Sequence, residues 1–368
     1  MRRSRGANGL FSYPTPFTPP TTEDDRLSWL RLIRSRRVGV ATFHRLLDEH
    51  RSAQAALAAL PDVASAAGLA DYSPCPEGVA AAEMRAGARA GAALICKGDA
   101  LYPALLAESP DAPPLFWAQG DLSLLTRPMV AIVGARNASS LGLRMARALA
   151  EGLGADGTLV VSGLARGIDA AAHTAALPTG TLAVMAGGLD VTYPPENRAL
   201  AADILRQGVL VSEQPFGLEP QARHFPQRNR IVAGLARAVV VVEAATGSGS
   251  LITARMALDQ GREVMAVPGH PFDGRAGGCN ALIRDGAILV RGAQDVLAAL
   301  AGDTGAAMVQ PADASPPSGP ARHPGNPHPP ERPLVEIAAL HSQILDRLGP
   351  SPLAEDQLIR DIGHPAAV

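Results

Sequence analysis

The chain has 368 residues with 33 basic and 35 acidic side chains, which gives a formal net charge of −2. Lys97 is its only lysine and is followed by Gly98, so the sequence excludes a G-x-x-x-x-G-K-[ST] phosphate loop. At roughly 150 residues per domain the length allows two or three domains. The near-neutral total charge by itself points away from a nucleic-acid partner.

The composition also bears on compartment and membrane association. The three cysteines, Cys75, Cys96 and Cys279, have neither CxxC nor metal-ligand spacing, so we expect free thiols in a reducing cytoplasm and no metal site. We expect no membrane span, because no apolar run of about 18 residues exists. Residues 1–23 combine arginines with prolines and lack an apolar stretch, which favours a disordered leader over a signal peptide.

Residues 24–125 begin with a helical pattern. Apolar side chains recur at helical spacing in two groups, Leu27, Leu30 and Ile33, then Phe43, Leu46 and Leu47. Between the groups, residues 36–40 form a short hairpin with Gly39 after two arginines. A helix-hairpin-helix can present N–H groups and arginines to a phosphate backbone, but a small packing module with solvated arginines fits equally well. We assign 24–125 to a helical N-terminal domain and a connector.

From residue 126 to 301, short β-branched runs alternate with alanine-rich helical segments. The expected strands are 129–133, 158–161, 181–186, 209–212, 238–243, 263–267 and 287–290. The expected helices are 142–152, 169–177, 197–207 and 250–259. Continuous apolar strands alternating with helices are typical of a parallel sheet covered on both faces. The sequence therefore predicts an α/β, Rossmann-like, doubly wound parallel sheet.

The C-terminal part has a different character. Residues 302–333 are rich in proline and have no periodicity, which predicts an extended linker. Residues 334–368 follow, with two short helices expected at 335–348 and 355–362.

Glycine- and serine-rich loops follow three of the expected strands, at 134–140, 162–169 and 243–250. In open α/β sheets, ligands bind at the carboxyl ends of the strands. There, glycine lets the backbone approach an anion, and the N–H groups of the next helix donate to it. One such loop would fit an ordinary turn, but three on one edge predict a row of anion sites. None is G-x-G-x-x-G, so we expect no dinucleotide and no other cofactor.

A basic segment at 221–237 indicates the size of the anion. It lacks acidic residues and holds four arginines, Arg223, Arg228, Arg230 and Arg237. So many fixed cations beside phosphate-binding turns favour a polyanionic strand over a small molecule. The alternative is a solvated basic face, or internal ion pairs to Glu213 and Glu219.

Candidate catalytic groups are few. Asp169 and His173 are spaced i, i+4 and could form a dyad, although Asp169 fits a helix N-cap better. HExxH and GxSxG are both absent. Asp190 could hold a sugar hydroxyl or simply belong to a turn. We therefore predict a binding protein and not an enzyme.

Five motifs are specific enough to indicate a family. They are VAIVGAR at 130–136, VSGLARGID at 161–169, GLDVTYPPEN at 188–197, FPQRNRIVAGL at 225–235 and EAATGSGSLIT at 243–253. Together, and in this order, they resemble the DNA-processing protein A family, known as DprA or Smf. The flanking parts resemble the family's SAM-like or helix-hairpin-helix-like N-terminal domain and its C-terminal winged-helix domain, here partial over 334–368.

The resemblance implies a homodimer that binds single-stranded DNA without sequence preference, protects incoming strands during natural transformation and helps load the RecA recombinase. We expect the dimer contact in the late part of the Rossmann-like segment. The positions that match the family's DNA pocket are Arg136, Ser162, Gly163, Arg166, Arg228, Asn229, Arg230, Gly247, Ser248, Gly249 and Ser250.

The chain departs from the family pattern after its Tyr-Pro dipeptide. Many relatives carry a basic residue there, whereas this chain has Pro195 and Glu196. One phosphate contact is then missing, or it is supplied by Arg198 or Arg223. Because aromatics make up only 4% of the chain, base stacking should be limited to candidates such as Tyr193 and Phe225.

The rival interpretation is a nucleotide-processing enzyme. Rossmann-like proteins that resemble phosphoribohydrolases cleave nucleoside monophosphates with similar loops, and Glu243 or Asp190 could act at the sugar. Their PGGxGTxxE loop is absent from this chain, which favours the binding protein.

Overall fold

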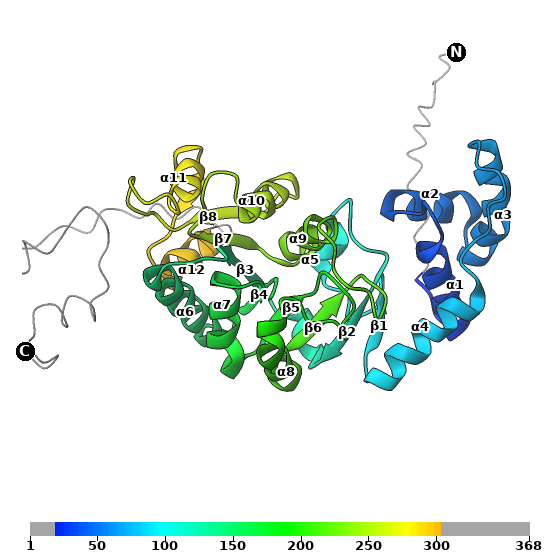
Figure 1. Cartoon of the computed structure of the whole chain (residues 1–368), viewed down its shortest axis with the longest axis horizontal. Coiled ribbons are helices and arrows are strands. Elements are labelled where there is room, and N and C mark those ends of the chain that lie inside the picture. Colours follow the sequence, from blue (N-terminus) through cyan, green and yellow to red (C-terminus); the bar gives the residue numbers. More distant parts are fainter. Residues whose placement is uncertain (1–18, 303–368) are drawn as a thin grey trace, which may run out of the picture. The chain divides into compact units, whose positions relative to one another are not determined.

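The computed structural model describes residues 19–302, and its first elements are four helices (Figure 1). They are α1 (Glu23–Arg34), α2 (Val40–His50), α3 (Ala53–Ala66) and α4 (Glu77–Ala90). α1 begins at a capping box, because the Thr22 hydroxyl accepts from the Asp25 amide while the Asp25 carboxylate accepts from the Thr22 amide. Leu30 and Phe43 are fully buried in the core of these helices. The predicted helical N-terminal domain is confirmed.

A nine-stranded sheet follows, in the order β1-β2-β6-β5-β4-β3-β7-β8-β9. Its strands are β1 (Ala93–Cys96), β2 (Leu115–Gly120), β3 (Met129–Gly134), β4 (Leu159–Ser162), β5 (Thr181–Val184), β6 (Val209–Ser212), β7 (Ala238–Val242), β8 (Glu263–Ala266) and β9 (Ile288–Leu289). The pairs from β6 to β9 are all parallel, whereas the pairs β1–β2 and β2–β6 at one edge are antiparallel. The predicted α/β, Rossmann-like sheet is confirmed.

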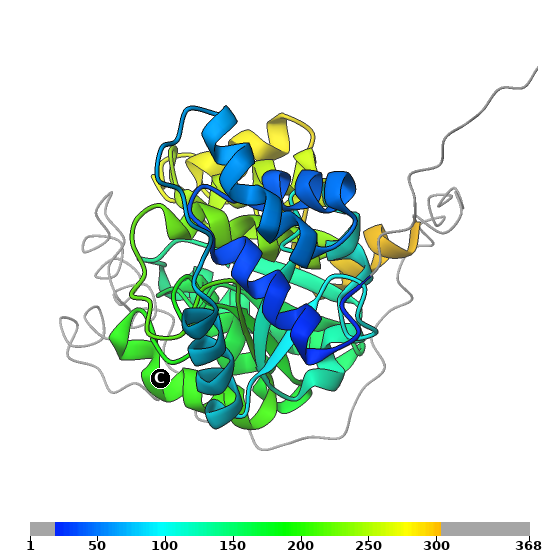
Figure 2. The same cartoon turned by 90° about the vertical axis from the view of Figure 1, so that its right-hand side faces the viewer.

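The sheet begins earlier in the chain than the expected boundary at residue 126. β1 and β2 lie in the segment that the sequence analysis treats as a connector, where few residues are β-branched. The Trp117 indole on β2 donates to Glu83 of α4 at 2.8 Å, and Glu83 also pairs with Arg34 of α1 at 2.8 Å. These contacts join the four helices to the β1–β2 edge, which faces the viewer in Figure 2. The connector is therefore part of the sheet.

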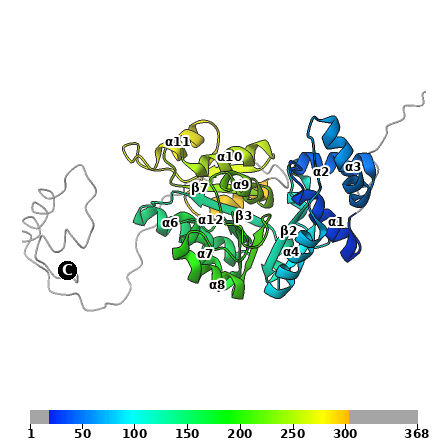
Figure 3. The ribbon, with the colours of Figure 1, turned by 45° about the vertical axis from the view of Figure 1, so that its right-hand side comes forward.

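Helices cover both faces of the sheet (Figures 1 and 3). On one face lie α6 (Ser140–Ala155), α7 (Ile168–Ala176), α8 (Arg198–Gln207) and α12 (Ala293–Gly302). On the other lie α5 (Ala104–Glu108), α9 (His224–Leu235), α10 (Gly249–Asp259) and α11 (Gly277–Arg284). Side chains alternate along each strand, so Val130 and Ile132 pack toward α6 while Ala131 and Val133 pack toward α9 and α10. The sheet is thus doubly wound.

The sequence and the structure differ most in the second half of the sheet. The four predicted helices correspond to α6, α7, α8 and α10, but α9, α11 and α12 have no predicted counterpart, and the predicted strand at 287–290 is only the two-residue β9. The sequence pattern did not predict α9, because the helix lacks apolar residues at regular helical spacing. Its first turns are polar and basic, and Ile231, Val232 and Leu235 lie near its end.

Some predicted features lie outside the described residues. These are residues 1–18 of the leader, nearly all of the linker 302–333 and the whole of 334–368. Within residues 19–302, no helix is long and apolar enough to cross a bilayer. The cysteines are free and buried, as their spacing predicts, and burial raises the pKa of Cys96 to about 12.

Candidate functional site

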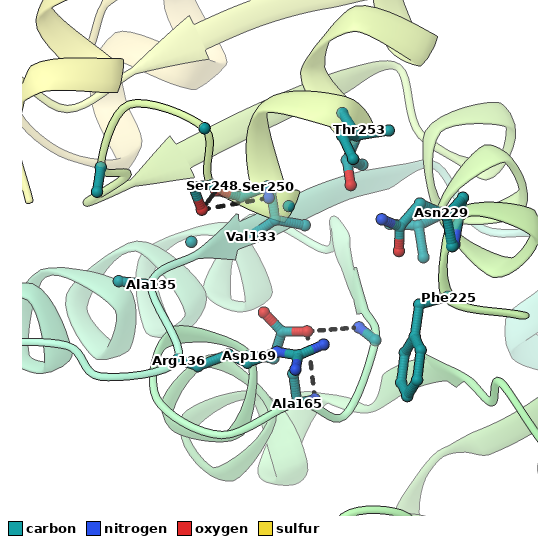
Figure 4. A pocket seen from close by; sticks show the side chains of 18 of the residues that line it. Val133, Ala135, Arg136, Ala165, Asp169, Phe225, Asn229, Ser248, Ser250 and Thr253 are labelled. Carbon is teal, nitrogen blue, oxygen red and sulfur yellow. Dashed lines mark hydrogen bonds between the residues drawn. The ribbon is translucent and has the colours of Figure 1, made fainter. Parts of the chain in front are cut away.

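A pocket of about 680 Å³ lies at the carboxyl ends of β3, β4 and β7 (Figure 4). The chain adds β4, β5 and β6 on one side of β3, and β7, β8 and β9 on the other. β3 and β7 therefore flank the topological switch point, where doubly wound sheets bind their ligands. The lining of this main pocket comes from 134–137, 163–169 and 245–250 and from one side of α9. The three loops predicted to form a row of anion sites do meet in one place.

Asp169 lies beneath the pocket and shapes one of its loops. Its Oδ2 accepts hydrogen bonds from the Gly163 amide at 3.1 Å and the Ala165 amide at 3.3 Å (Figure 4). The expectation that Asp169 caps α7 is wrong, because Gly167 is the N-cap and no side chain bonds to that helix end. Burial raises the pKa of Asp169, and the nearby Arg228 and the two amides oppose that rise.

Arg228 of α9 is the cation that compensates Asp169. Only 7% of its surface is exposed. Its Nη1 donates to the Val184 carbonyl at 2.9 Å and to the Gly163 carbonyl, and its Nε donates to Asn229 Oδ1 at 3.0 Å. A Cβ on Gly163 would clash with the Arg228 guanidinium, so a side chain here would push the guanidinium off these carbonyls. Arg228 and Asn229 line the pocket, but the guanidinium is held by protein acceptors.

Arg136 is the cation at the pocket mouth. It follows β3, and its guanidinium lies over the Phe225 ring at 5.3 Å from the centroid, a cation–π contact. The Phe225 and Tyr193 rings are 5.6 Å apart, and Tyr193 is 46% exposed. Among the described residues, Arg136 forms no ion pair. It also lines a smaller adjoining space of about 280 Å³, the side pocket, together with Arg166, Tyr193 and Phe225.

The opposite wall of the main pocket is the start of α10. Gly247 has a φ of 86°, a left-handed conformation that favours glycine. Ser248 is the N-cap, and its Oγ lies 2.8 Å from the Ser250 hydroxyl (Figure 4). The predicted turn Gly247, Ser248, Gly249 and Ser250 lines the pocket in full. The free amides of a helix N-terminus attract anions, so this wall suits a phosphate.

Arg275 also lines the main pocket, and the sequence analysis missed it. It lies in the loop between β8 and α11, where it pairs with Asp273 at 3.1 Å. The rule that ligands bind after parallel strands would have found it, had we applied it to the strand at 263–267 as well.

Four of the predicted contact residues do not line the main pocket. Arg230 pairs with Glu213, donates to the Asp111 carbonyl and is 12% exposed, so the alternative of an internal ion pair describes it. The Ser162 hydroxyl is fully buried and donates to a backbone carbonyl of β3 at 2.6 Å. The exposed Arg223 hydrogen-bonds to its neighbour His224, and Arg166 lines the side pocket, where it pairs with Glu196.

The residues that the enzyme interpretation needs have structural partners. Glu243 accepts from the amide and hydroxyl of Ser139, and Asp190 accepts from the Gly217 amide at 2.8 Å. His173 is fully buried with Nδ1 at 2.8 Å from the Thr181 hydroxyl, and its burial lowers its pKa to about 3. Within residues 19–302, no group of three His, Cys, Asp or Glu side chains could hold a metal ion.

Comparison with known proteins identifies the family of this chain. Residues 93–301, more than half of the chain, match the family described as DNA recombination-mediator protein A. The chain belongs to this family. The matched segment begins at the first residue of β1, in agreement with the sheet boundary. Residues 23–86 match a DprA-like N-terminal HHH domain, and residues 328–368 match a DprA winged helix domain.

Relatives of known sequence and structure support the assignment. The chain is 48% identical to the DNA processing protein DprA of Streptococcus pneumoniae over 202 residues, which are 54% of this chain and 71% of that protein. It is 44% identical to protein Smf of Escherichia coli over 207 residues, 55% of each chain. The X-ray structure of the S. pneumoniae DprA superposes with a TM-score of 0.60 at 37% identity, over 74% of this chain and 95% of that one.

A second solved structure concerns DprA of Helicobacter pylori and its single-stranded DNA binding mode. It superposes with a TM-score of 0.53 at 28% identity, over 58% of this chain and 96% of that one. Both superpositions cover most of the relative's chain and less of this one, and the fold they share is the one described above.

Proposed function

We propose that this chain is a binding protein, not an enzyme, and that it takes single-stranded DNA without sequence preference at the main pocket. The observation that carries the proposal is Arg136, whose guanidinium lies on Phe225 at the mouth without an ion pair among the described residues. A phosphate at this mouth meets a planar cation on one side and the N-terminal amides of α10 on the other.

Two features favour a single strand over a duplex. The pocket is confined between loops, so an unpaired nucleotide can enter it more readily than a stacked base pair. Phe225 and the half-exposed Tyr193 offer ring faces to unpaired bases, and such stacking is tolerant of sequence. The single-stranded DNA binding mode described for the H. pylori relative supports the same choice.

The wider role follows from the family. We infer that the protein acts in the cytoplasm, protects incoming strands during transformation and helps load the RecA recombinase, as the family resemblance implies. The description of the family as a recombination mediator and the relatives' names as DNA processing proteins support this role.

We also propose a homodimer formed through the late part of the sheet. β9 is the last strand at that edge among the described residues, so within them one side of its backbone has no neighbouring strand. Leu289 on β9 is 44% exposed, and Phe272 in the preceding loop is 95% exposed. Exposed apolar side chains beside a sheet edge favour contact with a second copy.

Arg136→Ala tests the DNA proposal. A charge-assisted contact is worth about 1.5–3 kcal/mol, so binding should weaken by about tenfold or more for all sequences alike. The salt dependence of log K should become shallower by about 0.7 per lost phosphate contact. Fluorescence anisotropy with oligonucleotides of several sequences, single- and double-stranded and at two salt concentrations, measures both effects.

Arg147→Ala is the matched control, because Arg147 is an exposed arginine on α6 that does not line either pocket. Its affinity for DNA should equal that of the wild type. Equal wild-type affinity for duplex and single strand, or a loss confined to particular bases in the Arg136 variant, would overturn the proposal.

A further inference from the structure

Three arginines converge on the side pocket, and each is held differently. Arg228 is buried on backbone carbonyls, Arg136 lies on Phe225, and the side chain of Arg166 is 61% exposed and pairs with Glu196. Among the described residues that line this pocket, none is acidic. Glu196 stands just outside the lining, with its side chain 47% exposed. Arg166 is therefore the only one of the three whose charge is met by an exposed carboxylate.

Glu196 precedes a residue whose side chain is bonded to the loop that carries Arg166. It lies in the short 3₁₀ turn η3 (Pro195–Asn197). The side-chain Nδ2 of Asn197 donates to the Leu164 carbonyl at 2.9 Å and to the Ala165 carbonyl at 3.2 Å, and Ala165 directly precedes Arg166 in the sequence. The carboxylate and the guanidinium are thus anchored to the same loop. An exposed ion pair is usually weak because forming it restricts two long side chains. Here the Asn197 bonds already hold the two backbone segments side by side, so less conformational entropy is lost when the pair forms.

We propose that Glu196 competes internally with the DNA phosphate for Arg166, so that this acidic residue sets how tightly and how salt-dependently the side pocket holds a strand. The proposal deepens the proposed function and rests on it. Arginine presents a planar fork of donors that fits a carboxylate as well as a phosphate. A phosphate that approaches Arg166 must displace the carboxylate and then tolerate its negative charge nearby. Glu196 thereby weakens the contact between Arg166 and a DNA phosphate in the side pocket.

Glu196→Gln tests this, because it removes the charge and keeps the shape. An exposed ion pair is weak, so single-stranded DNA should bind about two- to fivefold more tightly to this variant at low salt. The slope of log K against log salt should steepen by up to about 0.7, the contribution of one added phosphate contact on a single strand. Fluorescence anisotropy of the full chain with a labelled oligothymidylate, over a series of salt concentrations, measures both quantities.

Asp203→Asn is the matched control. Asp203 pairs with Arg206 on α8, the two side chains are 36% and 66% exposed, and neither lines a pocket. The change in net charge is the same, so a general electrostatic effect would appear equally in both variants. We expect the gain in Glu196→Gln only, and we expect it to disappear when Arg166→Ala is added.

The outcomes separate this inference from the proposed function. If the wild type and Glu196→Gln both fail to bind single-stranded DNA, the proposed function fails, and this inference fails with it. If the wild type binds but Glu196→Gln matches Asp203→Asn, or if its gain persists without Arg166, the proposed function stands and the competition between Glu196 and phosphate is refuted.

Discussion

Replacing Arg228 by methionine probes whether this arginine is a DNA contact or a part of the fold. The guanidinium donates to the carbonyls of Val184 and Gly163 and compensates the buried carboxylate of Asp169. Methionine fills a similar volume but supplies neither donors nor charge. The variant therefore leaves Asp169 with hydrogen-bond donors that carry no charge, among them the amides of Gly163 and Ala165.

The size of the effect follows from the burial of both charges. Arg228 acts on Asp169 through space and not as a direct ion pair, so its removal should cost about 3 kcal/mol, the lower end of the range for breaking a buried pair, because the remaining charge loses its compensation. For a domain of this size, each kcal/mol shifts the melting temperature by about 2–4 °C, so a loss of roughly 10 °C is expected. Adding Asp169→Asn should recover about half of the loss, because the double variant buries no net charge.

Thermal unfolding followed by circular dichroism measures these shifts. Arg223→Met is the matched control, since Arg223 is an exposed arginine just before α9 that hydrogen-bonds to His224 and forms no ion pair among the described residues. Its melting temperature should stay close to that of the wild type. DNA binding is measured below the transition, where the folded fraction is known.

One result would refute the reasoning directly. If Arg228→Met has the melting temperature of the wild type but no longer binds single-stranded DNA, then Arg228 contacts the strand and does not stabilise the fold. Failure of Asp169→Asn to recover any stability would likewise show that the two charges are not coupled.

Two further predictions concern buried polar groups. Arg230→Met removes the contacts to Glu213 and the Asp111 carbonyl, which should cost about 2–3 kcal/mol of unfolding free energy. The DNA affinity of this variant should be unchanged. A loss of affinity in the folded variant would show that Arg230 contacts DNA and does not serve only as the partner of Glu213. His173 has its pKa lowered from 6.5 to about 3 by burial, so between these values the unfolded state binds a proton that the folded state does not. The unfolding free energy should therefore fall as the pH drops, by about 2 kcal/mol from pH 6.5 to 5. In the His173→Leu variant this pH-dependent loss of unfolding free energy should be absent, which urea titrations at both pH values measure. An equal loss in the wild type and the variant would show that His173 does not cause it. Asp169 acts with the opposite sign because its pKa is raised, but it is present in both proteins.

The basic segment at 221–237 shows how far the sequence alone could go. Its charge predicted an anion site, and Arg228 and Asn229 do line the pocket. Arg230 could have been separated from Arg228 once a helix was recognised, because residues two apart on a helix do not share a face. The helix went unrecognised since its apolar residues gather at one end. Arg275 was missed for a different reason, as it comes from a fourth strand end.

The balance of 33 basic and 35 acidic residues points to no charged partner, and only the placement of the charges changes that view. The sequence determined the α/β class, most strand positions and the three glycine-rich loops, because backbone geometry and burial leave periodic traces in the chain. The tertiary structure decided which cations are available. Arg136 lies at a pocket mouth, Arg228 is buried on the carbonyls of Gly163 and Val184, and Arg166 pairs with Glu196. These contacts join segments that lie far apart in the chain, so they cannot be predicted from a local sequence pattern.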